Sequence, residues 1–300
     1  MAHKKTKLTI IIPACNEGEE VRNTILSIKE DVEIIVVDDF STPSAQDPEG
    51  WRDISDLSVK VIHNKLPLGF GGSIQAGIDV AKGDNIWICG ARTRFPEKFL
   101  DVITEALKDR PETIFSVQSA ILRYDQTDVE KAEGVYYGAN IQYHNEKQKI
   151  FGWLWNYGVR EERLGEVPCA YGGSYILRKD FWTKIHGLNG IDHRGGCNQF
   201  LSLKAWTLGD GVRMMPLRVG NIYRDRCSYP VNTASVIYNR VMIMTLMFGY
   251  AKGLECLNSY RGKYYEQVRL AYAYRSGWMA EEIAYLRKNR KRKLCGIVEY

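Results

Sequence analysis

Short apolar runs that end in polar residues constrain the fold of this chain more than any other feature. Leu8-Thr-Ile-Ile-Ile-Pro13 and Glu33-Ile-Ile-Val-Val-Asp38 are continuous β-branched runs, typical of strands buried on both faces of a parallel sheet. Between them, Val21, Ile25 and Ile28 have helical spacing. The alternation continues with predicted strands at 59–63 and 85–89 and predicted helices at 73–81 and 96–107.

This order predicts an α/β fold with a mostly parallel central sheet flanked by helices. In such sheets, ligands bind at the carboxyl ends of the strands. The residues at those ends are Pro13 to Glu17, Asp38 and Asp39, and Gly90 to Arg94. We therefore expect the functional site to be built from these segments.

Composition narrows the class of protein further. The chain has 300 residues, 45% hydrophobic and 26% charged, as in an ordinary globular protein, and its net charge of +5 is compatible with phosphate-bearing ligands. Seven scattered cysteines form no C-x-x-C pair, so we expect reduced thiols rather than a zinc site or disulfides. The charged start is unlike a signal peptide, and the most apolar stretch, Val241–Phe248, is too short to span a bilayer. We expect a cytoplasmic protein without a transmembrane segment.

Four motifs are spread over residues 7–230 in a consistent order. They are Ile11–Glu17, Val36–Thr42, Leu68–Gly77, and Gly195–Trp206 with Val219–Arg224 behind it. Together they resemble the motifs of family-2 glycosyltransferases, in the GT-A fold group that includes polypeptide N-acetylgalactosaminyltransferases. The resemblance implies a GT-A-like domain over 1–230, with a nucleotide-binding half at 7–110 and an acceptor half at 111–230. A basic, Tyr- and Arg-rich helical extension is predicted over 231–300.

The resemblance implies transfer of a sugar from a nucleotide-sugar donor, which we expect to be a UDP-sugar, to a hydroxyl acceptor. In this interpretation Asp39 accepts the imide N–H of uracil or holds a ribose hydroxyl. The other expected nucleotide-binding residues are Pro13, Ala14, Asn16, Glu17, Asp38, Gly69, Gly71 and Gly72.

Each of these assignments has an alternative. The glycines allow backbone to approach a phosphate, but they also suit a tight turn packed against the sheet. The two aspartates also suit helix capping or loop hydrogen bonding. Glu17 also suits the start of the following helix, where an acid complements the helix dipole.

The chain departs from the family in three places. The D-x-D motif that chelates Mn²⁺ or Mg²⁺ corresponds to Gly90-Ala-Arg92, the acceptor-side acid to Gly196-Cys-Asn198, and a metal-binding histidine of many relatives to Val219-Gly-Asn221. A hard divalent cation prefers oxygen ligands, and the side chains of residues 90–92 offer none. We therefore expect no metal site and no required cofactor. Mn²⁺ or Mg²⁺ would bind only if ligands elsewhere replaced the motif.

Two interpretations follow. In the first, the enzyme is metal-independent: Arg92 offsets the charge of the leaving diphosphate, and Asp192 or His193 is the general base. The alternative for Arg92 is a surface arginine paired with an acid, and for residues 192–194 a solvated turn. In the second, the fold is retained without catalysis, as a binding or scaffolding module. The retention of Asp39 and the glycine-rich segment favours the first.

The acceptor is the least constrained part of the prediction. Trp153 and Trp155, with Cys197 and Asn198, are the expected acceptor-side residues, since aromatic faces stack on sugars and bases. The alternative for the tryptophans is core packing. The helical extension ends in the basic run Arg287–Lys293, which suits nucleic acid or an anionic membrane surface unless it is merely solvated. With DNA as partner, a hydroxymethylated base in phage-type DNA becomes a candidate acceptor.

Overall fold

The computed structural model describes residues 8–42, 54–123, 129, 132, 134–143, 154–171, 174–222, 231–294 and 297–299. Its strands are β1 (Leu8–Ala14), β2 (Glu33–Asp38), β3 (Lys60–His63), β4 (Asn85–Ile88), β5 (Thr93–Arg94), β6 (Ile114–Leu122), β7 (Gly134–Tyr136), β8 (Ala139–Tyr143), β9 (Leu154–Gly158), β10 (Gly165–Val167), β11 (Tyr175–Arg178), β12 (Val212–Ile222) and β13 (Val298–Glu299). Its helices are α1 (Glu20–Ser27), α2 (Gly69–Val80), α3 (Leu100–Asp109), α4 (Lys179–Lys184), α5 (Cys197–Leu208), α6 (Thr233–Phe248), α7 (Tyr250–Ser259), α8 (Tyr265–Tyr274) and α9 (Ser276–Lys288).

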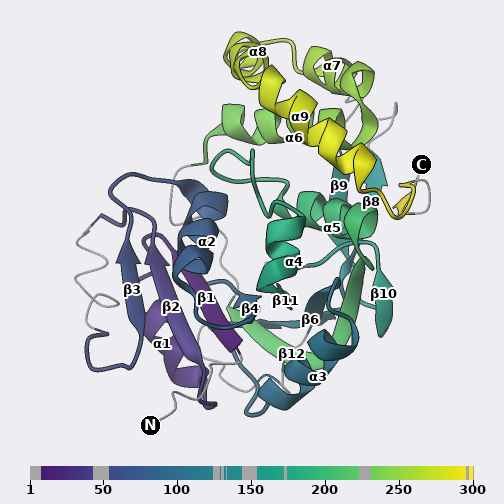
Figure 1. Ribbon diagram of the computed structural model, residues 1–300. Helices are drawn as coiled ribbons and strands as arrows, with labels where there is room; N and C mark the ends of the chain where they lie inside the picture. Colours follow the sequence, from purple (N-terminus) through teal and green to yellow (C-terminus); the bar gives the residue numbers. More distant parts are fainter. Residues whose placement is uncertain are drawn as a thin grey trace.

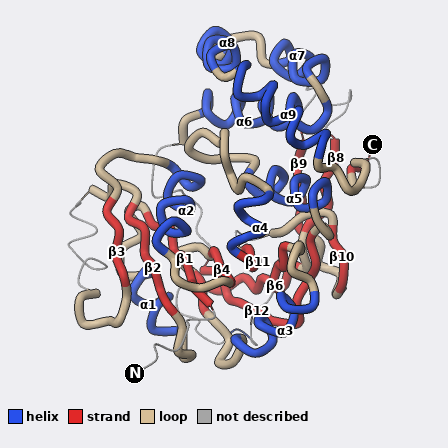
Figure 2. The backbone as a smooth tube through the Cα atoms, in the orientation of Figure 1, coloured by secondary structure: helices blue, strands red, loops and turns tan. Residues whose placement is uncertain are grey.

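A central sheet with helices on both faces confirms the predicted α/β class (Figures 1 and 2). Its strand order is β10-β12-β6-β11-β4-β1-β2-β3, with β5 beside β12 and β7 beside β6. Strands β1 to β4 pair in parallel, as expected for the first half. In the second half, β11 runs antiparallel to both β4 and β6, so the complete sheet is mixed.

The alignment of paired residues between β1 and β2 determines where these two strands end relative to each other. Pro13 lies beside Val37, and Ala14 lies beside Asp38. The carboxyl ends of β1 and β2 therefore meet at the same edge of the sheet. The loops that follow them are brought together there, as the sequence predicts.

Some element boundaries differ from the predictions for identifiable reasons. Helix α2 begins at Gly69 rather than residue 73, because the Asp39 carboxylate accepts the N–H groups of Leu68 and Gly69 at 2.7 and 2.8 Å. Strand β12 continues to Ile222, beyond the predicted 212–216, because it pairs with β6 along most of its length. Both differences depend on partners distant in sequence.

The β-branched residues of β1 serve two separate cores. Ile10 and Ile12 pack with α1 and α3 on one face of the sheet. Ile11 packs on the other face, with Ile74 and Ile78 of α2. This division follows the two-residue period of a strand and explains the continuous apolar run.

The C-terminal helices α6–α9 gather at one end of the molecule, near α4 and α5 (Figure 1). Val241 and Met242 of α6, and Met279 and Ile283 of α9, belong to the same hydrophobic cluster as Ile11 of the sheet. The core therefore continues across the boundary predicted at residue 230. In the part of the chain that the structure describes, no helix is both long and apolar enough to cross a membrane.

Part of the basic run after α9 is held on the core. Lys291 forms an ion pair with Glu112, and Arg292 forms one with Glu166 at 2.7 Å. The Arg292 guanidinium also lies over the Trp206 ring, 3.8 Å from its centroid. These two cations of the predicted run therefore have an observed role in packing the C-terminal segment.

A buried polar cluster joins α5 to α9. The Lys204 side chain is fully buried, with Nζ 3.8 Å from Oε1 of Glu282 and 3.3 Å from the carbonyl oxygen of His186. Oε2 of Glu282 lies 2.7 Å from Nδ1 of His186. Burial lowers the pKa of Lys204 to about 7, although the negative charge of Glu282 opposes that shift.

This pKa predicts a pH-dependent stability. Between about pH 7 and the usual lysine range, the unfolded chain binds a proton that folded Lys204 does not hold, so stability rises with pH by on the order of 1 kcal/mol per pH unit. Lys204→Met removes this contribution. The free energy of unfolding of wild type, relative to the variant, should increase between pH 7.5 and 9 in urea titrations. Lys98→Met, at an exposed position, is the control and should show no such trend; equal trends for the two variants would contradict the assignment.

Candidate functional site

A cavity of about 800 Å³ opens at the carboxyl ends of β1, β2 and β4, where the sequence places the ligand. The first half of the chain contributes Pro13, Ala14, Cys15, Asn16, Glu17, Asp39, Phe40, Thr42, Pro67, Gly69, Phe70, Ser73, Gly90, Ala91 and Arg92. The predicted acceptor half contributes His193, Arg194 and Asn221, and the start of the predicted extension contributes Val231 and Asn232. The cavity is therefore lined by both predicted halves and by the first residues of the extension.

The loop after β1 is tied to the loop after β2. The backbone N–H of Asn16 donates to Oγ of Ser41 at 2.9 Å, and Oδ1 of Asn16 accepts the N–H of Thr42 at 2.9 Å. Asn16 itself has a φ of 53°. All four residues predicted from this loop, Pro13, Ala14, Asn16 and Glu17, line the cavity.

The two aspartates after β2 have different surroundings. Asp38 is buried; its Oδ1 accepts the N–H of Ser41, and its Oδ2 lies 2.9 Å from Nδ1 of His63. Asp39 lines the cavity, and its oxygens accept from Nδ2 of Asn64 and from the N–H groups of Leu68 and Gly69. Both residues thus make the loop and capping contacts that the sequence left as the alternative. A carboxylate has about four acceptor sites, so these bonds leave Asp39 capacity for a ligand.

The three glycines before and within α2 also differ. Gly69 has a φ of 72°, and a Cβ built on it would lie 2.2 Å from Cα of His193. Next to this contact, the N–H of Phe70 donates to the carbonyl oxygen of His193 at 2.8 Å. A Cβ on Gly71 would meet Leu188, and one on Gly72 would meet Leu68. Only Gly69 of the three is on the described cavity wall; the other two serve packing.

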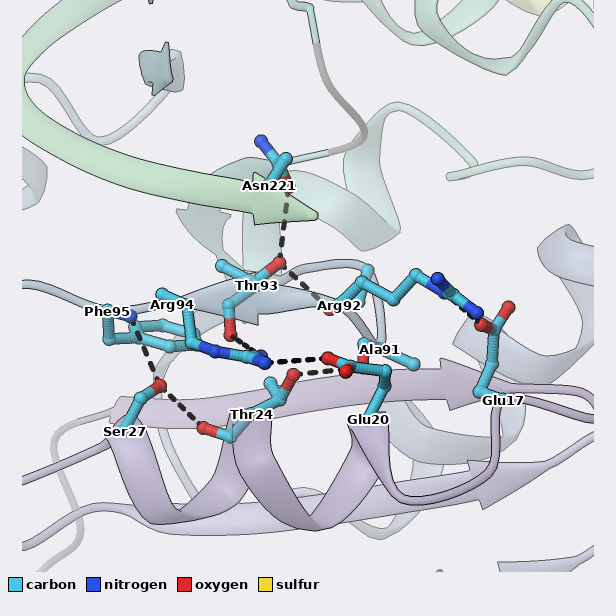
Figure 3. A network of polar contacts seen from close by, with 11 residues as sticks. Glu17, Glu20, Thr24, Ser27, Ala91, Arg92, Thr93, Arg94, Phe95 and Asn221 are labelled. Carbon is cyan, nitrogen blue, oxygen red and sulfur yellow. Dashed lines mark hydrogen bonds and ion pairs between the residues drawn. The ribbon is translucent and has the colours of Figure 1, made fainter. Parts of the chain in front are cut away.

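Arg92 occupies the first loop after β4 and points toward Glu17 (Figure 3). Its Nε donates to Oε2 of Glu17 at 2.7 Å, and the side chains are 16% and 10% exposed. Arg92 thus lines the cavity and is paired with an acid, as its alternative has it, but it is largely buried rather than on the surface. Its role in offsetting the diphosphate charge stays a prediction. Pairing holds the guanidinium in one place on the wall.

A second, more buried pair fixes the same loop to α1. Arg94 contacts Glu20 at 2.7 Å, and Oγ1 of Thr24 donates to the carbonyl oxygen of Ala91 at 2.9 Å (Figure 3). The N–H of Phe95 donates to Oγ of Ser27 at 3.1 Å. Successive turns of α1 thus hold the loop that carries Arg92.

Helix α6 holds the segment that carries Asp192 and His193. Asn239, fully buried, accepts the N–H of Asp192 at 2.7 Å, and its amide nitrogen lies 2.8 to 3.0 Å from the carbonyl oxygens of residues 192, 194 and 195. The Asp192 carboxylate accepts from Oγ of Ser235 at 2.7 Å. His193 lines the cavity, whereas Asp192 faces α6. Geometry thus distinguishes the two predicted bases.

The predicted acceptor-side residues lie away from the cavity or outside the described residues. Burial raises the pKa of the Cys197 thiol to about 11, and Asn198 accepts a hydrogen bond from the Tyr175 hydroxyl. Trp153 lies outside the described residues, as does the side chain of Trp155. None of the four is therefore observed on the described cavity wall.

A comparison with known families agrees with this architecture. Residues 9–181 match the family model described as Glycosyl transferase family 2. The chain belongs to glycosyl transferase family 2.

Individual relatives are distant. Glycosyltransferase GlyG of Streptococcus pneumoniae is 21% identical over 225 residues, covering 72% of this chain and 73% of that protein. Polypeptide N-acetylgalactosaminyltransferase 11 of Xenopus tropicalis is 26% identical over 208 residues, covering 66% of this chain. The chain spans about a third of that relative, 34% of its length.

Solved structures show the same fold. GalNAc-T7, crystallised with UDP, GalNAc and Mn²⁺, gives a TM-score of 0.65 at 17% identity and covers 95% of this chain and 58% of that chain. S. aureus TarS 1–349 with UDP-GlcNAc gives 0.51 at 15% identity and covers 84% of this chain and 72% of that chain. The predicted GT-A fold is confirmed.

The described residues of the cavity wall offer no D-x-D carboxylates to a divalent cation. Where D-x-D is expected, the wall carries Gly90, Ala91 and the Arg92 guanidinium, which repels a cation. The nearby carboxylate of Glu17 is paired with Arg92, and that of Asp39 accepts backbone N–H groups. Among the described residues, no group of three or more His, Cys, Asp or Glu is arranged to hold a metal ion.

Several cavity residues of this family-2 glycosyltransferase were not identified from the sequence. They are Phe40, Thr42, Pro67, Phe70, Ser73, Arg194, Asn221, Val231 and Asn232. Asn221 was noted only as a lost metal ligand. Phe40 and Arg194 could have been predicted, because they directly follow Asp39 and His193 in the sequence. Nothing in the sequence indicated Val231 and Asn232 as cavity residues, because they precede a helix that was assigned to the extension.

The close approach at Gly69 predicts an unequal effect of two alanine substitutions. Gly69→Ala forces a left-handed alanine against the His193 backbone and should lower the free energy of unfolding by about 2 kcal/mol or more. Gly71→Ala meets the side chains of Leu188 at 3.3 Å and Ile191 at 3.7 Å and gains helix propensity, so a change within about 1 kcal/mol is expected. Urea denaturation measures both. Equal losses would show that the Gly69–His193 contact is not formed.

Proposed function

We propose that this chain transfers a sugar from a UDP-sugar, bound in the cavity, to a hydroxyl acceptor without D-x-D carboxylates. The observation that carries the proposal is that one cavity brings together Asp39, Arg92 and His193 from three separate segments. These side chains suit the three tasks of nucleoside recognition, charge stabilisation and proton removal. In this proposal, residues 7–110 bind the nucleotide and 111–230 the acceptor, and the helices of 231–300 complete the site.

Arg92 is proposed to stabilise the leaving diphosphate. Its guanidinium is held on the cavity wall by Glu17, with only 16% of the side chain exposed. Charge–charge hydrogen bonds are stronger in a partly desolvated site than in water, and the planar guanidinium matches two phosphate oxygens. A prepositioned arginine would therefore supply the positive charge that D-x-D enzymes obtain from a metal.

His193 is the better placed of the two proposed bases. It lines the cavity, whereas the Asp192 carboxylate is hydrogen-bonded to Ser235. In the proposed reaction, an imidazole nitrogen removes the acceptor hydroxyl proton as that oxygen bonds to the anomeric carbon. The bond from the anomeric carbon to the diphosphate oxygen breaks, and the diphosphate leaves with the electron pair. Direct displacement of this kind inverts the anomeric centre.

For the acceptor, we propose only the chemical group, a hydroxyl. A hydroxymethylated base in phage-type DNA is one candidate, motivated by the net charge of +5 and the basic C-terminal run. Because Lys291 and Arg292 form ion pairs with the core, DNA contact would have to rely on other cations.

The second candidate is nucleotide-sugar binding without turnover. It is favoured by the acceptor side, where a buried Cys197 stands in place of the family's acid and its thiol pKa is raised to about 11. A thiol in that state is a poor base near neutral pH. A measurement of sugar transfer or nucleotide-sugar hydrolysis distinguishes this candidate from the first.

The metal claim has a direct test. A UDP-sugar should stabilise the folded protein against thermal unfolding, both without and with EDTA. At a ligand concentration 100 times Kd, the free energy of unfolding should rise by about 2.7 kcal/mol. A panel of nucleotide sugars, each with EDTA or with Mn²⁺, measures ligand and metal together, and a parallel hydrolysis assay measures turnover. Stabilisation that requires Mn²⁺ would refute the proposal, and stabilisation without hydrolysis or transfer would favour the second candidate.

Arg92 and Arg94 form a matched pair for testing the diphosphate role. Arg92→Ala should weaken UDP binding by about tenfold or more while changing uridine binding little, because only UDP carries the diphosphate. Arg94→Ala breaks the buried pair with Glu20 and should lower stability by about 3 kcal/mol, yet leave the ratio of the two affinities unchanged.

A double variant separates the charge of Arg92 from that of its partner. Arg92→Ala alone leaves the diphosphate beside the Glu17 carboxylate without the Arg92 guanidinium. Combining it with Glu17→Gln removes both charges. The loss of UDP affinity should persist in the double variant; full recovery would mean that Arg92 acts only by neutralising Glu17.

A further inference from the structure

Phe40 on the cavity wall has an unusual backbone conformation for a large residue. Its φ is 61°, in the left-handed region, and the residue is 48% exposed. L-residues avoid this region because Cβ crowds the carbonyl oxygen. Such a conformation persists only when the surrounding structure imposes it, and it is often found where a side chain must be held for function.

Hydrogen bonds on both sides impose the conformation. The N–H of Asp39 donates to the carbonyl oxygen of Ala14 at 2.8 Å, and the N–H of Ser41 donates to Oδ1 of Asp38 at 2.9 Å. The N–H of Thr42 donates to Oδ1 of Asn16 at 2.9 Å. Residue 40 therefore joins two anchored segments and cannot relax alone. Glycine or asparagine would satisfy this turn with less strain.

Among the described residues, hydrophobic packing does not account for phenylalanine at this position either. Phe40 belongs to neither hydrophobic cluster in the described part of the chain. About half of its surface is exposed beside a cavity whose wall also includes the apolar residues Pro13, Ala14 and Phe70. A flat, apolar ligand would remove this aromatic surface from water. Neighbouring Asp39 supplies acceptors for the hydrogen-bond donors of the same ligand.

We propose that Phe40 is a stacking platform for the nucleobase of the donor and that its strained backbone holds the ring on the cavity wall. The inference rests on the proposed function and adds a residue that determines affinity for the base. Every nucleobase has a π-face, so stacking strengthens binding of any base. Selection among bases then depends on hydrogen-bonding groups such as Asp39.

The test uses substitutions that retain the turn. Phe40→Asn and Phe40→Gly both tolerate positive φ but remove the ring, while Phe40→Tyr retains it. Calorimetry should show UDP binding about 5- to 100-fold weaker for the first two variants, and close to wild type for tyrosine. Affinity for inorganic pyrophosphate, which has no base, should be unchanged in all three. The order of preference among UDP, GDP and ADP should also be retained.

The outcomes distinguish this inference from the proposed function. If wild type binds UDP and Phe40→Asn binds it equally well, the stacking role is wrong and the proposed function stands. If pyrophosphate affinity falls as much as UDP affinity, the substitutions have distorted the cavity and the specific role is also overturned. If wild type binds no nucleotide, both proposals fail. Thermal denaturation of the glycine variant checks that the turn is retained.

Discussion

The cavity depends on one backbone contact between the two halves of the chain. Gly69 lies so close to His193 that no side chain fits, and the adjacent N–H of Phe70 donates to the His193 carbonyl oxygen. On one side of this contact, the Asp39 carboxylate holds the start of α2. On the other, Asn239 of α6 holds the backbone around His193. These contacts in series connect the end of β2 to the C-terminal helices and set the width of the cavity.

Two arginines in and behind the cavity wall each form an ion pair with a glutamate. Arg92 with Glu17, and Arg94 with Glu20, fix the loop after β4 to the start of α1. The more buried second pair serves the structure, whereas the first lies on the cavity wall. Gly90, Ala91 and Arg92 stand where D-x-D is expected, so this part of the wall carries a paired guanidinium and no side-chain carboxylate.

Helix α6 and the residues just before it help to form the cavity. Asn232, just before α6, lines the cavity, and Asn239 within α6 positions His193. Residues of α6 and α9 share a hydrophobic cluster with the central sheet. Composition alone suggested a basic, partner-binding extension, because a sequence shows charge without showing what it contacts. Lys291 and Arg292 in fact pair with acids of the core.

The sequence by itself determined the four parallel strands of the first half, the α/β class and the edge of the sheet at which the cavity opens. Apolar periodicity is a local property, and the ends of parallel strands meet at one edge whatever surrounds them. That is why Pro13–Glu17, Asp39 and Arg92 were found on the cavity wall, whereas His193 comes from the segment between α4 and α5. Only the tertiary structure decided what each residue contacts. Arg92 and Glu17 are 75 positions apart, and Asp192 faces α6 because of Ser235, 43 positions away. Such pairings depend on distances between folded elements, which no local pattern encodes.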